Sequence, residues 1–235
     1  MAIKKEFDMY NTVIKYLGHS AFFIKTKNSG ILIDPFISQN SASDFDYTKE
    51  KITHIFVTHG HNDHLGDAVN ISKNTGAQII AVFELANFCL NRGANAFGVN
   101  LGGKLNFDFG SAIFCPAYHS SSTPDGSYAG CAASILFDFD GLKIFHAGDT
   151  CLSQEFKTIK EIYSPDVAML PVGGIFTMDI EQASIAAKWI SAKYIIPMHY
   201  NTFPLIKTDI HKFKMMVDNE QQQALILGIN EQFEL

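Results

Sequence analysis

The segment 58–66, THGHNDHLG, places three histidines and one aspartate directly after the apolar run IFV. Such a run is typical of a buried strand, so the polar segment begins where the strand ends. Side chains two positions apart in an extended loop point to the same side, so His59 and His61 can reach one cation. We expect Asp63 and His64 to point toward a second, nearby position as the chain turns into a helix. Because imidazole and carboxylate groups are usual ligands of zinc and related metals, the segment predicts a metal-binding loop.

A solvated, histidine-rich loop without a metal is the alternative interpretation of this segment. Four polar groups held beside a buried strand would lose hydration without gaining a partner, which is unfavourable. The sequence therefore favours a metal site.

The length and composition of the chain indicate one globular domain. The 235 residues are 47% hydrophobic and 18% charged, which is typical of a folded protein. Two-sheet architectures of this length often form one domain, so we expect a single domain over residues 1–235. The net charge is −6 and Arg92 is the single arginine, which argues against nucleic-acid partners because those need a basic patch. A pocket for one small anionic group stays compatible with this charge.

The cysteines and the lack of long apolar runs indicate a cytoplasmic protein. The four cysteines form no CxxC pair, so we expect reduced, mostly buried thiols, and no ligand role for Cys151. The N-terminus lacks the apolar core of a signal peptide, and no apolar run is long enough to span a membrane. We expect a soluble protein in the cytoplasm, and a homo-oligomer stays open.

Short apolar runs bounded by turn residues predict strands, and amphipathic stretches predict helices. The Asp-Gly pair at residues 140–141 is a strong hairpin signal. Asp179 can cap a helix with one apolar face, and Gln182 can reach back to it. Residues 38–47 lack a period and predict a loop that borders a pocket. The expected strands cover residues 13–16, 21–24, 31–34, 55–58, 78–83, 112–115, 131–139, 142–146, 167–171 and 194–197. Residues 101–109 begin the second set of strands. The expected helices cover residues 67–75, 85–91, 153–163 and 180–190.

The order of these elements shows two β-rich segments, each followed by alternating helices and strands. This order is expected for two sheets that pack face to face with helices outside them. Periodicity alone predicts only a mixed α and β class.

The segment around His59 resembles the HxHxDH motif of the metallo-β-lactamase superfamily. The resemblance implies an α/β fold, the four-layer αββα sandwich of the metallo-β-lactamase type. It also implies later ligands at strand ends, in the order histidine, aspartate, histidine. His119, Asp149 and His199 follow later apolar runs in that order. A lone histidine after a strand is more often a loop residue, but the three together match in order and context.

The resemblance also implies how these side chains divide between two cations. Two sets of ligands and a bridging residue are implied, namely His59, His61 and His119 for one metal, Asp63, His64 and His199 for the other, and Asp149 between them. We expect two divalent ions, zinc in the first place. Because all ligand atoms are nitrogen or oxygen, manganese and iron stay open.

Four further motifs are similar to one branch of the superfamily, the small metal-dependent hydrolases similar to L-ascorbate phosphate lactonase. The motifs are LGHSAF at 17–22, GDT at 148–150, PVGGIFTM at 171–178 and PMHYNTFP at 197–204, so the similarity covers nearly the whole chain. Thr177 in the third motif could line the pocket. Ile175 and residues 130–134 depart from the pattern of the branch, and both differences could reshape the substrate pocket.

The resemblance implies a hydrolase in which a metal-bound hydroxide attacks a carbonyl carbon or a phosphorus atom of a small molecule. A small ester, most specifically a lactone, is the first hypothesis. A phosphodiester substrate and a non-catalytic metal-binding or ligand-binding domain are the alternatives. Asp63 could accept a proton while it binds metal, His19 could contact the substrate or leaving group, and Tyr200 could stabilise an oxyanion. Structural roles are the alternative for His19 and Tyr200, and we expect His146 to orient the loop that follows it.

Overall fold

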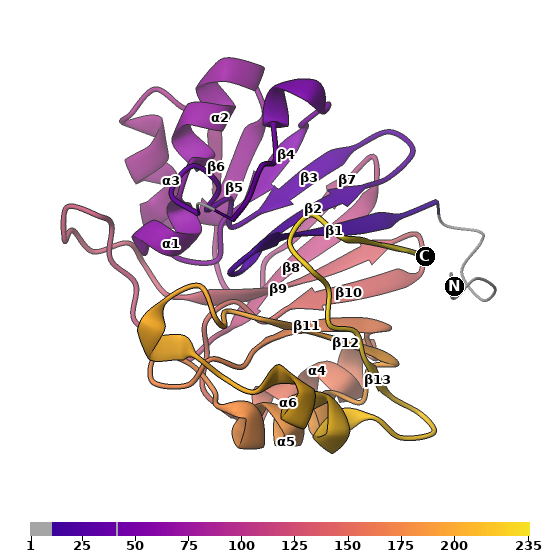
Figure 1. Ribbon diagram of the computed structural model, residues 1–235. Helices are drawn as coiled ribbons and strands as arrows, with labels where there is room; N and C mark the ends of the chain where they lie inside the picture. The colour runs from indigo at the N-terminus through magenta and orange to yellow at the C-terminus, as the bar shows by residue number, and fades with distance from the viewer. Residues whose placement is uncertain (1–10, 41) are drawn as a thin grey trace.

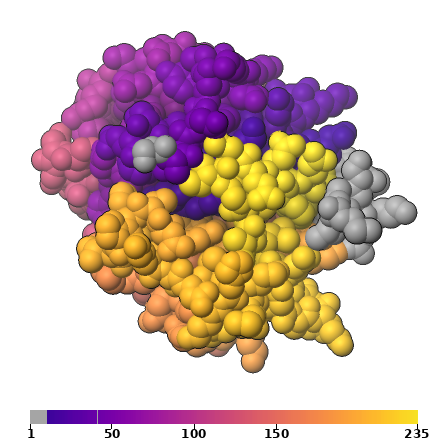
Figure 2. Space-filling view, viewed as in Figure 1, coloured from indigo at the N-terminus to yellow at the C-terminus, as the bar shows by residue number. Residues whose placement is uncertain are grey.

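Two sheets pack face to face in the computed structural model, which describes residues 11–40 and 42–235 (Figure 1). The first sheet contains, in spatial order, β14 (Gln232–Glu234), β1 (Val13–Gly18), β2 (Ala21–Lys25), β3 (Gly30–Ile33), β4 (His54–Phe56), β5 (Gln78–Val82) and β6 (Ala96–Val99). The second sheet contains β13 (Gln223–Ala224), β12 (Tyr194–Met198), β11 (Val167–Pro171), β10 (Leu142–His146), β9 (Ala133–Phe139), β8 (Gly110–Pro116) and β7 (Lys104–Phe107). Figure 2 shows the same division, with the N-terminal part of the chain above and the C-terminal part mostly below.

Each sheet combines an antiparallel and a parallel part. In the first sheet, β14 to β3 pair antiparallel and β3 to β6 pair parallel. In the second sheet, β7 to β10 pair antiparallel and β10 to β13 pair parallel. The hairpin predicted at residues 140–141 is confirmed, since β9 and β10 pair with Phe139 opposite Leu142. The parallel parts need crossover connections, which supply the helices.

Helices cover the outer face of each sheet, which confirms the predicted four layers (Figure 1). α1 (Asn62–Leu65), α2 (Ala68–Thr75) and α3 (Phe83–Leu90) lie beside the first sheet, and α4 (Glu155–Tyr163), α5 (Ile180–Ile190) and α6 (Ile210–Val217) lie beside the second. Asp179 caps α5 as predicted, because its Oδ1 accepts a hydrogen bond from the backbone N of Gln182 at 2.8 Å. None of the helices in the described part of the chain combines the length and the apolar character that a membrane span needs.

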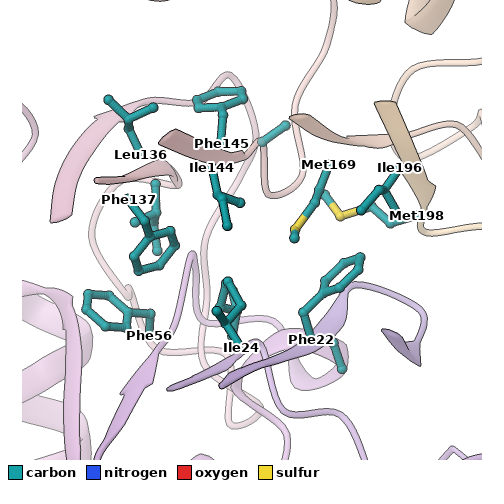
Figure 3. Close-up of a cluster of buried hydrophobic side chains, with 14 of the residues drawn as sticks. Phe22, Ile24, Phe56, Leu136, Phe137, Ile144, Phe145, Met169, Ile196 and Met198 are labelled. Atoms are coloured by element: carbon teal, nitrogen blue, oxygen red, sulfur yellow. The ribbon is translucent and has the colours of Figure 1, made fainter. Parts of the chain in front are cut away.

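The hydrophobic core fills the space between the two sheets (Figure 3). Phe22, Ile24 and Phe56 of the first sheet face Phe137 and Met169 of the second. The rings of Phe56 and Phe137 meet edge to face, with centroids 4.8 Å apart. Both are fully buried, and each such burial contributes about 1.5–3 kcal/mol. The shared core fixes the sheets against each other and thereby fixes the loops at their ends.

Several elements differ from the prediction because tertiary contacts define them. β6 is a short edge strand that contains a glycine, and β14 pairs with β1 from the opposite end of the chain. α6 and β13 are also absent from the prediction. β4 ends at Phe56 instead of residue 58, because Thr58 turns to donate its backbone N–H to Asp34.

The cysteines are only in part as predicted. All four are free, and Cys89 and Cys115 are buried, which raises the pKa of each thiol to about 12. Cys131 and Cys151 are exposed, so the expectation of mostly buried thiols is wrong for them. Both lie in loops outside the strands, where no core covers them.

Candidate metal centre

All seven predicted metal ligands lie together at one edge of the sandwich. They follow β4, β8, β10 and β12, so both sheets contribute side chains. Ligand sites in α/β sheets commonly form at the carboxyl ends of parallel strands. Three overlapping groups have candidate ligand atoms within 4.8 Å of one another, namely His59, His61 and His119, then His59, His64 and Asp149, and finally His19, Asp63, His64 and His199.

The first group consists of three imidazoles. His59 Nε2 lies 3.0 Å from His61 Nδ1, and the ring of His119 lies 5.1 Å from each of the other two rings. Burial lowers the pKa of all three histidines, most strongly for His59. The three side chains are therefore neutral near pH 7 and have nitrogen lone pairs for a cation.

The last group, which contains His19, Asp63, His64 and His199, combines a carboxylate with imidazoles. His199 Nε2 lies 3.9 Å from Asp63 Oδ2, and the rings of His64 and His199 are nearly parallel, with centroids 5.7 Å apart. His64 is fully buried. Burial disfavours its charge, but Asp149 and Asp34 outweigh burial and raise the pKa of His64 well above its usual value. Without a cation, this imidazolium supplies part of the positive charge that the carboxylates require.

Asp149 lies between the group that contains His119 and the group that contains His199. Its Oδ2 lies 3.3 Å from His64 Nε2, 3.2 Å from His199 Nε2 and 3.5 Å from His119 Nε2. Burial alone would raise the pKa of this carboxyl, but His64 and His199 hold it well below its usual range. A carboxylate between the two groups has the position that a bridging ligand requires.

Orphaned polar atoms indicate that these side chains fit a cation. Within the described part of the chain, His64 Nε2, Asp149 Oδ1 and His199 Nδ1 are buried and have no hydrogen-bond partner. Buried polar atoms in folded proteins almost always have one. Nitrogen and carboxylate donors at this density suit zinc, and they suit manganese and iron as well.

Asp34 determines which nitrogen of His64 faces the cluster, although the sequence analysis assigned it no functional role. The residue is fully buried, and its Oδ2 lies 2.7 Å from His64 Nδ1. A carboxylate only accepts, so His64 Nδ1 donates and Nε2 is the nitrogen left for a metal. The available signal was an aspartate directly after the apolar strand of residues 30–33.

Asp34 reaches His59 through a hydroxyl group. Thr58 Oγ1 donates to Asp34 Oδ2 at 2.7 Å, which uses its only hydrogen. Thr58 Oγ1 therefore accepts the hydrogen bond from His59 Nδ1, 3.1 Å away, and leaves His59 Nε2 free. One carboxylate thus sets the tautomer of a histidine in each group.

His19 orients Asp63 in this structure. Its Nε2 lies 3.0 Å from Asp63 Oδ2 and its Nδ1 lies 2.6 Å from Thr202 Oγ1. Burial lowers the pKa of His19 to about 4, although the hydrogen bond to Asp63 acts in the opposite direction. The ring is therefore neutral at pH 7. Because Asp63 only accepts, Nε2 carries the proton and Nδ1 accepts from Thr202. The side chain of Thr202 is a contact that the sequence analysis did not identify.

The backbone at the centre adopts unusual conformations. His19, Asp34 and His199 all have positive φ, at 57°, 45° and 55°. His199 N donates to the carbonyl of His19 at 2.7 Å, so two of these residues hold each other. Positive φ is unfavourable for residues other than glycine, and such conformations cluster at functional sites.

The remaining predicted residues lie around the cluster. His146 donates from Nε2 to Ser20 O at 3.0 Å and accepts from Gly148 N at 3.1 Å, which fixes the loop before Asp149. Tyr200 is partly buried against the core, and burial raises its pKa. Thr177 is partly buried in the loop after β11.

Comparison with known proteins agrees with this geometry. Residues 13–199 match the model of the β-lactamase superfamily domain. The chain belongs to the metallo-β-lactamase superfamily. It is 45% identical to a UPF0173 metal-dependent hydrolase from Geobacillus thermodenitrificans, over 92% of this chain and 97% of that protein. A Bacillus mycoides protein of the same description is 44% identical, over 92% of this chain and 96% of that protein.

A solved structure supports the same assignment. The metallo hydrolase from the archaeon Ignicoccus hospitalis is 36% identical, with a TM-score of 0.88, over 95% of this chain and 98% of that chain. The superfamily member described here is therefore a metal-dependent hydrolase, with a histidine and aspartate cluster that could hold the metal.

Proposed function

We propose that this superfamily member is a dinuclear hydrolase of small-molecule esters, most specifically lactones. The observation that carries the proposal is the position of Asp149 between two groups of neutral or paired imidazoles. The first cation would be held by His59, His61 and His119, the second by Asp63, His64 and His199, and both by Asp149. Zinc is the first choice for both positions, with manganese or iron as the alternatives.

Two bound cations would supply a hydroxide at neutral pH and a Lewis acid for the carbonyl oxygen. The side chains of the protein supply the rest. His19 holds Asp63 Oδ2 through its Nε2–H, which leaves Asp63 Oδ1 to accept a proton. Tyr200 follows a ligand directly and is the proposed donor to the developing oxyanion.

The position of the single arginine favours an ester over a phosphodiester. Arg92 binds Asp125 at 2.8 Å and lies over the ring of Phe88, 3.3 Å from its centroid. Neither contact involves a residue of the metal centre. Arginine is a preferred group for binding phosphate, so its engagement elsewhere weakens the phosphodiesterase alternative.

The experiment is an assay of zinc-loaded and manganese-loaded protein against panels of lactones and phosphodiesters. We expect lactone hydrolysis that disappears after chelation and returns with metal. His61→Ala should remove one of two metal equivalents, measured by mass spectrometry, together with activity. His211→Ala, on the exposed surface of α6, should retain both. Turnover by metal-free protein would refute the mechanism, and tight metabolite binding without turnover would favour a non-catalytic domain.

A further inference from the structure

Two loops beside the metal centre expose large apolar side chains. The first loop follows β11 and the second follows β12, and both leave the second sheet on the same side (Figure 1). Four of these exposed side chains form what we call the apolar rim. They are Ile175 with 70% of its surface exposed, Phe176 with 50%, Phe203 with 37% and Leu205 with 63%. Exposed apolar groups that gather at one place commonly mark a binding surface.

The second loop is continuous with the metal centre. The ring of Phe203 lies 5.1 Å from the ring of His19 and 6.2 Å from that of Phe36, which belongs to the first half of the chain. Thr202, its neighbour, is the residue that fixes His19 Nδ1. Phe203 therefore lies directly beside the side chain that orients Asp63.

The first loop is pressed against the second. A Cβ atom on Gly173 would lie 2.2 Å from the carbonyl oxygen of His199 and 2.9 Å from Ile206 Cβ, so only glycine permits this contact. Val172 N also donates to Met198 O at 3.0 Å. The contact places Ile175 and Phe176 next to the loop that begins with a proposed metal ligand.

Ile175 has a backbone conformation that a β-branched residue rarely adopts. Its φ is 57°, in the left-handed region, where glycine or asparagine is less strained. An isoleucine that is both strained and mostly exposed gains little stability from its side chain. Strained residues of this kind cluster at sites of function.

We propose that the apolar rim binds the alkyl or aryl substituent of the substrate, so the enzyme prefers esters and lactones that carry an apolar group. This inference rests on the proposed hydrolase function and specifies its substrate class. The rim carries no charge, and the metal centre beside it would take the polar ester group. Burial of a methylene changes affinity by up to about fourfold, so kcat/KM should rise with chain length.

The test measures kcat/KM of zinc-loaded protein for γ-lactones from γ-valerolactone to γ-decalactone. For the wild type we expect a rise of at least about tenfold over the series. Ile175→Asn should reduce that rise by half or more while raising the thermal midpoint by about 2–4 °C, because asparagine relieves the strain. Ile162→Asn is the matched control and should keep the wild-type dependence, since Ile162 is an exposed isoleucine of α4 at the opposite end of the sheet.

A second measurement separates failure of the rim from failure of the hydrolase. Calorimetry compares decanoate with acetate binding to the zinc-loaded wild type and Ile175→Asn. Turnover with no chain-length dependence would overturn the rim and leave the hydrolase intact. Absence of turnover with every lactone would refute the proposed lactone hydrolysis, and decanoate binding equal in both proteins would then overturn the rim as well. A wild-type dimer that Ile175→Asn dissociates, with an unchanged lactone profile, would make the rim an interface between copies instead.

Discussion

Asp34→Asn is expected to weaken metal binding at both positions without unfolding the protein. The Asp34 carboxylate accepts from Thr58 N, from Thr58 Oγ1 and from His64 Nδ1, at 2.8, 2.7 and 2.7 Å. Asparagine has nearly the same shape and also tolerates the φ of 45° at this position. The substitution therefore changes hydrogen-bonding capacity and charge, and leaves the backbone conformation accessible.

The size of the effect follows from the two tautomers. The new amide keeps one acceptor for Thr58 N but presents a donor where Oδ2 was. Thr58 Oγ1 then accepts from the amide and donates to His59 Nδ1, and His64 Nδ1 loses its acceptor. His59 then carries its proton on Nε2, the nitrogen that faces the cluster, and neutral His64 is no longer held with its proton on Nδ1. Loss of such a supporting contact costs about 10–100-fold in metal affinity, which corresponds to about 1.4–2.7 kcal/mol at each position.

The assay is competition for zinc against a chromophoric chelator, with stoichiometry from mass spectrometry. Asp125→Asn makes the same chemical change on an exposed carboxylate that binds Arg92, and it should leave both affinities unchanged. If Asp34→Asn kept both dissociation constants within about threefold of wild type, the tautomer argument would be refuted. A loss at one position only would restrict the argument to the histidine of that group.

Two further predictions concern stability. In metal-free protein, the pKa of His19 is lowered from 6.5 to about 4. The contribution of neutral His19 to the free energy of unfolding is therefore complete above pH 6.5. It is lost as the pH falls toward 4, by up to about 3 kcal/mol. Denaturant titrations from pH 7 to 4 should show that the free energy of unfolding falls less steeply with pH in His19→Asn than in the wild type. An equally steep fall in both proteins would contradict the role assigned to His19. Gly173→Ala should destabilise the protein by about 1–3 kcal/mol, because the new methyl group meets the carbonyl of His199. Gly228→Ala, where a Cβ meets nothing closer than 3.4 Å, is the control, and equal stability of the two variants would contradict the proposed contact.

The sequence predicted much of the fold because periodicity and turn residues are local signals. The Asp140-Gly141 hairpin and the Asp179 cap depend on a few adjacent residues, and both are present. The four-layer arrangement came from the resemblance to a family, since periodicity gave only a mixed class. β14 had no comparable signal, because three residues at the end of the chain become a strand only by pairing with β1.

The candidate site also has one part that the sequence predicts, the ligands, and one part that only the structure shows, the residues that orient them. The seven proposed ligands stand in a recognisable order, and the structure brings them together. The residues that orient these ligands were harder to identify from the sequence. Asp34 and Thr202 act through hydrogen bonds to residues that are distant in the sequence. A buried aspartate after a strand has many ordinary roles, and only its geometry identifies this one. The contact of Gly173 with the backbone of His199 is likewise a packing relation that no local pattern encodes.

The origin of the ligands in both sheets has a consequence for biosynthesis. During translation, His59, His61 and His64 leave the ribosome well before His199. Until the second sheet docks on the first, the nascent chain offers only a fragment of the donor set, which would hold a cation weakly. If the seven proposed ligands hold the metals, full metal retention would therefore require the two sheets to be docked, and metal content would measure how much of the protein has assembled.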